Sequence, residues 1–171
     1  AQGVIADQNL ALTAVMSGGA WVAAQPVTNL NKPGYKSDPA RCVDIGNLAA
    51  SQFTATLETA RPVNLVGIMF HTLSSNASWR ITLAGLDGNL AAPVYQSAWT
   101  PVVGRLWDSS VLEWEVSNWW TGQPNEDELA LYPRHLWIPI PLDPGPICGA
   151  LRVEFQDQTN EAGYFVIGGV W

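Results

Sequence analysis

The sequence has few charged side chains, and few of those are basic. Lys, Arg, Asp and Glu make up 13% of its 171 residues, whereas a typical soluble domain has about 25%. Only 8 residues are basic against 15 acidic ones, which gives a net charge of −7. Because nucleic-acid binding requires a basic patch that neutralises phosphates, we expect no nucleic-acid partner. A surface with so few charges also indicates a chain that is partly covered by another molecule in a larger assembly.

Long apolar runs and a recognisable leader are missing as well. No hydrophobic stretch approaches the roughly 18 residues that a transmembrane helix requires, so we expect no membrane span. The first basic residue is Lys32, and no positively charged stretch precedes the mildly apolar N-terminus, so no secretory signal peptide is visible. With 47% hydrophobic residues the chain is too apolar for intrinsic disorder, and its length predicts one domain over residues 1–171.

Residues that build catalytic and metal sites are scarce. The two cysteines, Cys42 and Cys148, lie in no CxxC pair and near no histidine, so we interpret them as buried free thiols, with a disulfide as the alternative. We interpret His71 as a packed or hydrogen-bonded residue at the end of a strand, and His135 as solvated or ion-paired. Neither GxSxG nor HExxH occurs. We therefore expect a protein that is not an enzyme and that holds no metal and no cofactor.

Two alternatives to this expectation remain open. Carboxylates among aromatic side chains suit sugar hydrolysis, and a glycoside hydrolase would use two acids from the set Asp108, Glu113, Glu115, Glu126 and Asp127. A calcium ion could lie at predicted loop ends, near Asp7, Asp38, Asp44 or Asp157. No series of ligands like that of an EF-hand supports such a site.

Alternation of apolar and polar residues is the dominant pattern in the sequence. Phe53, Ala55 and Leu57 alternate with polar residues, as is typical of a half-buried strand. Alternation or a nearly continuous apolar run recurs over residues 64–71, 79–83, 151–156 and 164–171. Helical periodicity is weak, and its best candidate is a short surface helix over 125–132 that ends at Pro133. The pattern predicts an all-β fold, an antiparallel β-sandwich.

Six of the nine tryptophans lie between Ala98 and Ile138. A segment this long predicts a mostly irregular, acidic, Trp-rich insertion of about residues 95–140. Trp and Tyr rings stack on sugars and anchor protein interfaces, so the candidate residues for ligand or partner binding are Trp107, Trp114, Trp119, Trp120 and Tyr132. In an extended segment, the adjacent Trp119 and Trp120 would point to opposite sides. The alternative is that the six tryptophans form a small core of the insertion itself.

Several segments, in this order, resemble a known family. The stretch FTATLETARPVNLVGIMFHTLSSNASWRITLAG resembles the first half of discoidin-like, or galactose-binding-like, jelly-roll modules. A group of minor tail or tail-tip proteins of tailed bacteriophages carries this module. The entry segment of those proteins is similar to WVAAQPVTNLNKPGYKSDPARCVDIG, and their closing segment is similar to ALRVEFQDQTNEAGYFVIGGVW. Their Trp-rich insertion is similar to YQSAWTPVV followed by LEWEVSNWWTGQPNEDELALYPRHLWIPIP. The resemblance spans about Trp21 to Trp171. The chain departs from it at Gly168-Gly169, where the family commonly has Gly-Arg.

This resemblance implies a fold, a location and a function. The fold is a galactose-binding-like jelly roll, and the location is the virion, at the tail tip, after synthesis in the host cytoplasm. The implied function is that of a non-catalytic structural component that attaches to neighbouring phage tail proteins. The alternative is a carbohydrate-binding, receptor-recognition module for host cell-surface glycans.

Overall fold

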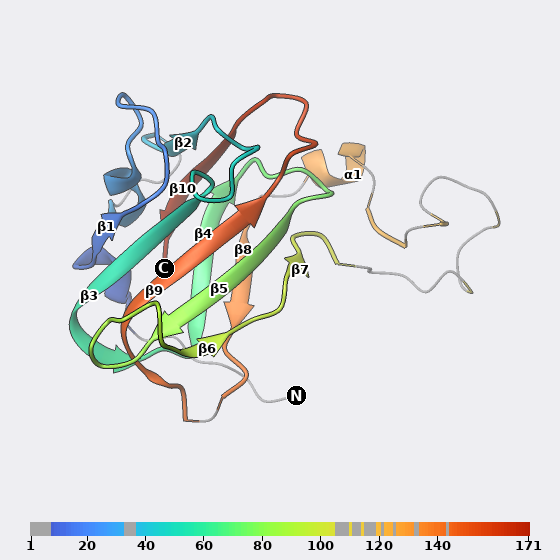
Figure 1. Cartoon of the computed structure of the whole chain (residues 1–171). Coiled ribbons are helices and arrows are strands. Elements are labelled where there is room, and N and C mark those ends of the chain that lie inside the picture. Colours follow the sequence, from blue (N-terminus) through green and yellow to red (C-terminus); the bar gives the residue numbers. More distant parts are fainter. Residues whose placement is uncertain are drawn as a thin grey trace.

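The computed structural model describes residues 8–32, 37–104, 110, 114, 119–120, 122–124, 126–131, 134–142 and 144–171. They fold into two antiparallel sheets packed face to face (Figure 1). The first sheet has the order β1-β3-β9-β5-β6, with β7 also paired to β5, and consists of β1 (Val15–Ser17), β3 (Gln52–Pro62), β9 (Ile147–Gln156), β5 (Ser78–Ala84), β6 (Pro93–Gln96) and β7 (Thr100–Pro101). The second has the order β2-β10-β4-β8 and consists of β2 (Ala40–Cys42), β10 (Phe165–Val170), β4 (Leu65–His71) and β8 (Leu136–Pro139). The predicted all-β antiparallel sandwich is confirmed.

The described residues form three short helices. Two are 3-10 helices, η1 (Leu10–Leu12) and η2 (Val27–Asn31), and the third is the α-helix α1 (Glu126–Ala130). The helix predicted over 125–132 is thus confirmed between Glu126 and Ala130, while residues 125, 132 and 133 lie outside the described part of the chain. Among the described residues, none of the helices has the length and apolar character that crossing a membrane requires.

The core lies between the two sheets, and the alternation of the central strands fills it. In β9, Leu151, Val153 and Phe155 are buried, whereas Gln156 is exposed. Aromatic rings join the sheets, because Phe155 of β9 meets Phe165 of β10 edge-on with ring centroids 5.5 Å apart. The alternation visible in the sequence therefore reports which side of each strand faces the core.

Cys42 and Cys148 are both buried and unbonded, which confirms their interpretation as free thiols. Burial raises the pKa of the Cys148 thiol to about 11, and it raises the pKa of Cys42 as well. The two residues lie in different sheets, Cys42 in β2 and Cys148 in β9. They act as small apolar side chains of the core.

The Trp-rich segment predicted over about 95–140 begins and ends in sheet structure. At its start, β7 pairs with β5, so that Thr100 lies opposite Trp79. At its end, β8 pairs with β4, so that Ile138 lies opposite Val66. Within β8, Leu136 and Ile138 are buried and alternate with the exposed Trp137 and Pro139. The part of the segment outside the two sheets is therefore shorter than 95–140.

Candidate ligand-binding site

Three of the five predicted binding residues lie together in one aromatic cluster, which we call the Trp cluster: Trp114, Trp119 and Trp120. The ring centroids of Trp114 and Trp119 are 4.4 Å apart at an interplanar angle of 52°, and those of Trp119 and Trp120 are 4.5 Å apart at 79°. Trp107 and Tyr132 lie outside the described residues. The structure therefore brings together the part of the predicted set that it describes.

The neighbouring residues Trp119 and Trp120 do not point to opposite sides. Both belong to a turn rather than to an extended segment, and their rings touch. Trp119 is half-buried, whereas 67% of Trp114 and 72% of Trp120 remain exposed. Trp114 and Trp120 each contact Trp119 and stay mostly exposed, so the three indoles form a surface platform onto which the apolar face of a ligand can stack.

The alternative in which all six tryptophans form a separate core is wrong for two of them. Trp99 lies beside the first sheet, where the guanidinium carbon of Arg80 is 4.7 Å from its ring centroid. Trp137 lies on β8 in the second sheet and meets Trp171 edge-on, with ring centroids 6.4 Å apart. These two indoles pack on the sandwich itself.

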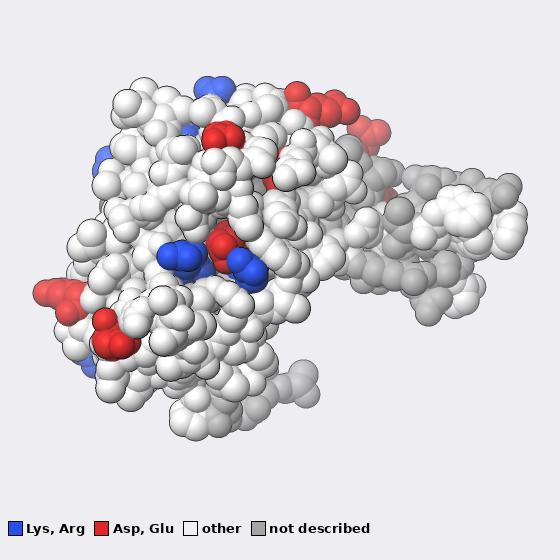
Figure 2. Space-filling model, viewed as in Figure 1, with Lys and Arg blue, Asp and Glu red and all other residues white. Residues whose placement is uncertain are grey.

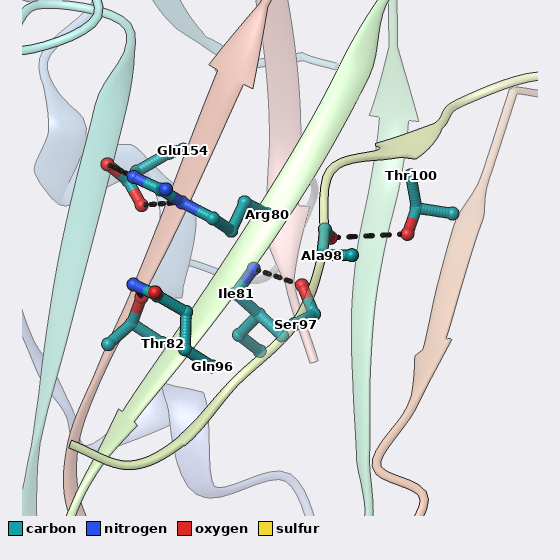
Figure 3. A network of polar contacts seen from close by, with 8 residues as sticks. All are labelled: Arg80, Ile81, Thr82, Gln96, Ser97, Ala98, Thr100 and Glu154. Carbon is teal, nitrogen blue, oxygen red and sulfur yellow. Dashed lines mark hydrogen bonds and ion pairs between the residues drawn. The ribbon is translucent and has the colours of Figure 1, made fainter.

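Ionic groups gather on the outer face of the first sheet, around β5 and β9. Arg80 donates from Nε to Oε2 of Glu154 and from Nη2 to Oε1, both at 2.8 Å (Figure 3). These bonds raise the pKa of Arg80 above its ordinary value. Beside this pair, Gln96 donates to the hydroxyl of Thr82 at 3.0 Å. This group could not be predicted from the sequence, because Arg80 and Glu154 are 74 positions apart and only the pairing of β5 with β9 makes them neighbours.

The two histidines lie at the end of β4 and serve the backbone and the core. His71 is the last residue of β4 and is only 5% exposed, as its interpretation as a packed residue predicted. Burial, followed by the positive charges of Arg134 and His135, lowers its pKa to about 4. His135 is half-buried, and its Nδ1 accepts a 3.0 Å hydrogen bond from the backbone N–H of Phe70, which has a φ of 47°. The prediction that His135 is solvated or ion-paired missed this role.

Two of the carboxylates considered for calcium have partners within the protein, and the two catalytic candidates that the structure describes, Glu126 and Asp127, are consecutive residues of α1. Asp157 accepts hydrogen bonds from Ser74 and Asn160, and Asp38 lies 3.4 Å from the ammonium of Lys32. Among the described residues, no three His, Cys, Asp or Glu side chains group as metal ligands. Asp7, Asp108, Glu113 and Glu115 lie outside the described residues.

A cavity of about 110 Å³ lies at the end of the sandwich where β3 leads into β4. Its lining is mainly apolar, with Leu57, Val66 and Val170 among its residues, and Asn64 and Gln8 add polar groups. Pockets for small-molecule ligands usually have about 300–1,000 Å³. This cavity is too small to enclose a sugar, so the surface platform of the Trp cluster is the better candidate.

No family model matches the sequence, and no curated protein sequence matches it. Solved structures do match over nearly the whole chain. A mutant of the lectin-binding domain of lectinolysin complexed with Lewis b has a TM-score of 0.61 at 8% identity, covering 98% of this chain and 96% of its own. The family 32 CBM of Clostridium perfringens NanJ in complex with galactose has a TM-score of 0.56 at 11% identity, covering 94% and 93%. CpGH89CBM32-4, produced by C. perfringens and in complex with GlcNAc-α-1,4-galactose, has a TM-score of 0.54 at 14% identity, covering 95% and 91%. The chain therefore has the galactose-binding-like jelly-roll fold.

Proposed function

We propose that the chain is a non-catalytic carbohydrate-binding module that recognises host cell-surface glycans through its Trp cluster. The observation that carries the proposal is the exposure of Trp114 and Trp120, which stand at 67% and 72% while both contact Trp119. Structures of the same fold that contain Lewis b, galactose or GlcNAc-α-1,4-galactose support it. At 8 to 14% identity, those structures support the fold and do not identify the ligand.

Stacking on exposed indoles suits a sugar better than it suits an ion. The C–H groups of one pyranose face form an apolar surface, and a Trp ring offers a large rigid surface at small cost in conformational entropy. A surface platform leaves much of the sugar in water, so the affinity of one site is expected to be modest. Several copies in one assembly would raise the overall affinity through effective concentration.

Binding of the labelled chain to a panel of immobilised glycans tests this proposal. We expect the double variant Trp114→Ala, Trp120→Ala to lose binding while its melting temperature stays within a few degrees of the wild type. Trp137→Ala is the matched control, because it removes an indole that is 49% exposed on β8, outside the Trp cluster. Equal binding by the double variant and the wild type would contradict the assignment of the site.

The tail-tip function stays a second proposal, based on the resemblance of the sequence. Exposed tryptophans also anchor protein interfaces, so the Trp cluster could bind neighbouring tail proteins instead of a glycan. The variants Trp119→Ala and Trp120→Ala in the virion separate the two functions. If the chain is a structural adaptor, the variants should lose particle assembly. If it is a glycan-binding module, the variant particles should assemble normally and lose adsorption to host cells.

A further inference from the structure

The outer face of the first sheet carries one arginine that is paired and one that is not. Arg80 of β5 is committed to Glu154 through two hydrogen bonds of 2.8 Å and lies over the ring of Trp99. Arg152 of β9 is half-buried, and its Nε is buried without a hydrogen-bond partner among the described residues. A buried donor without a partner costs free energy, so an acceptor at this place would be favoured.

The strand register gives Arg152 polar neighbours on both sides. Thr54 of β3 and Thr82 of β5 lie directly opposite Arg152, and Thr82 accepts a hydrogen bond from Gln96 of β6. Glu154, two positions along β9, shares the face of Arg152 because side chains alternate along a strand. Both of its carboxylate oxygens accept hydrogen bonds from Arg80.

The local charge at this face is opposite to that of the whole chain. The net charge of the sequence is −7, yet here two arginines, Arg80 and Arg152, share the face of β5 and β9 with a single carboxylate, that of Glu154. Figure 2 shows basic side chains on either side of an acidic one near the middle of the face formed by β3, β9 and β5. Since Arg80 neutralises Glu154, the charge of Arg152 is left for an anion.

Another arginine with an unpartnered Nε shows the contrast. In Arg41 of β2, the Nε is also buried without a hydrogen-bond partner among the described residues, but the guanidinium carbon lies over the ring of Tyr164, 3.8 Å from its centroid. This cation–π contact already stabilises the positive charge of Arg41. No ring contact or ion pair among the described residues holds Arg152 in this way.

We propose that Arg152 binds the carboxylate of an acidic saccharide on the outer face of the first sheet, at a site separate from the Trp cluster. A guanidinium forms two parallel hydrogen bonds with a carboxylate, a geometry that an ammonium does not offer. Thr54 and Gln52, both half-buried on the neighbouring strand β3, supply a hydroxyl and an amide oxygen for sugar hydroxyls. The amide nitrogen of Gln52 already donates to the carbonyl of Ala49 at 2.9 Å.

Titration of the ¹⁵N-labelled chain with glucuronate, followed by NMR, tests this site. Glucose is the neutral comparison, because it has a hydroxymethyl group in place of the carboxylate of glucuronate and is otherwise the same sugar. We expect glucuronate to bind about tenfold more tightly than glucose, to shift the Nε–H signal of Arg152 and to weaken as salt is added. Arg152→Gln should abolish this preference, and Arg152→Lys should keep part of it. Arg61→Gln is the control that removes the same charge from an exposed position at the end of β3.

Three results would overturn the site. Equal affinity for glucuronate and glucose would show that no carboxylate is recognised. If Arg61→Gln lost the preference for glucuronate as far as Arg152→Gln does, the preference would come from the overall charge of the protein. Acetate binding as tightly as glucuronate would show that the site takes a bare anion and no saccharide. The double variant Trp114→Ala, Trp120→Ala should keep the glucuronate response, so failure of the Trp cluster as a glycan site and failure of Arg152 are distinguishable.

Discussion

The indole of Trp137 covers the backbone of Gly67 on the neighbouring strand. The two residues lie directly opposite each other in β8 and β4, and a Cβ at Gly67 would be 2.7 Å from Cζ3 of Trp137. On its other side, Gly67 exchanges backbone hydrogen bonds of 2.7 and 2.8 Å with Trp171. The glycine thus gives room for the indole of Trp137 on the outer face of the second sheet.

Gly67→Ala is expected to destabilise the protein, because the added methyl group forces the ring of Trp137 away from β4. Overpacking of this kind typically costs about 1–3 kcal/mol. Thermal unfolding of the variant should show a lower melting temperature than the wild type. Gly46→Ala is the matched control, since a Cβ there meets nothing within 4 Å. An unchanged melting temperature for Gly67→Ala would show that the ring of Trp137 does not lie this close to Gly67.

Stability is expected to fall as the pH drops from about 6.5 to 4, partly because of His71. Its pKa is about 4 in the folded protein against about 6.5 in an unfolded chain, so the unfolded state binds more protons in this range. The lost stability amounts to up to roughly 3 kcal/mol by linkage. Denaturant unfolding of the wild type and of His71→Gln at several pH values measures the contribution.

The difference in the pH dependence of stability between the wild type and His71→Gln gives the contribution of His71 alone, because the carboxylates titrate in both proteins. We expect the variant to lose less stability than the wild type between pH 6.5 and 4. Parallel pH profiles of the two proteins would mean that His71 is protonated in the folded state and that its burial does not hold its pKa down.

The two thiols are expected to be unreactive in the folded protein. Burial raises the pKa of Cys148 to about 11 and that of Cys42 in the same direction, so at pH 8 both remain protonated and inaccessible. Reaction with a chromogenic disulfide reagent should be slow in buffer and complete for both thiols in guanidinium chloride. Rapid reaction of either thiol in buffer would contradict its burial.

Asp157 joins two loops at one end of the sandwich, and its loss is expected to destabilise both. Its carboxylate is almost completely buried and accepts hydrogen bonds from the backbone N–H and hydroxyl of Ser74 and from the amide of Asn160. Asp157→Asn places an amide donor among these donors, at a cost of about 2–4 kcal/mol. The exposed Asp87, which accepts a hydrogen bond from the backbone N–H of Asn89, gives the control Asp87→Asn. Comparable unfolding free energies for the two variants would refute the loop anchor.

The long strands could be predicted from the sequence because their alternation records burial. β3, β5 and β9 have seven or more residues each, and each carries this signal over about five or six of them. β1 and β2 have only three residues each, too few to show a period. β8 does alternate, with Leu136 and Ile138 buried, but its tryptophan led us to assign it to the insertion.

The two candidate sites also differ in how far they could be predicted from the sequence. The crowding of Trp114, Trp119 and Trp120 is local in the sequence, so composition alone indicated the cluster. The neighbours of Arg152 come from β3 and β5, and their positions depend on the register of strands far apart in the chain. Sequence patterns contain the period of a strand, but they do not contain its partner.

That the Trp cluster binds a glycan is tested most directly by binding of the protein to surface polysaccharide extracted from candidate host cells. The labelled wild type and the double variant Trp114→Ala, Trp120→Ala are compared, with free polysaccharide as competitor. We predict saturable wild-type binding that the competitor displaces and that the folded double variant loses by at least about tenfold. Absence of binding by the folded wild type, or equal binding by both proteins, would contradict the claim.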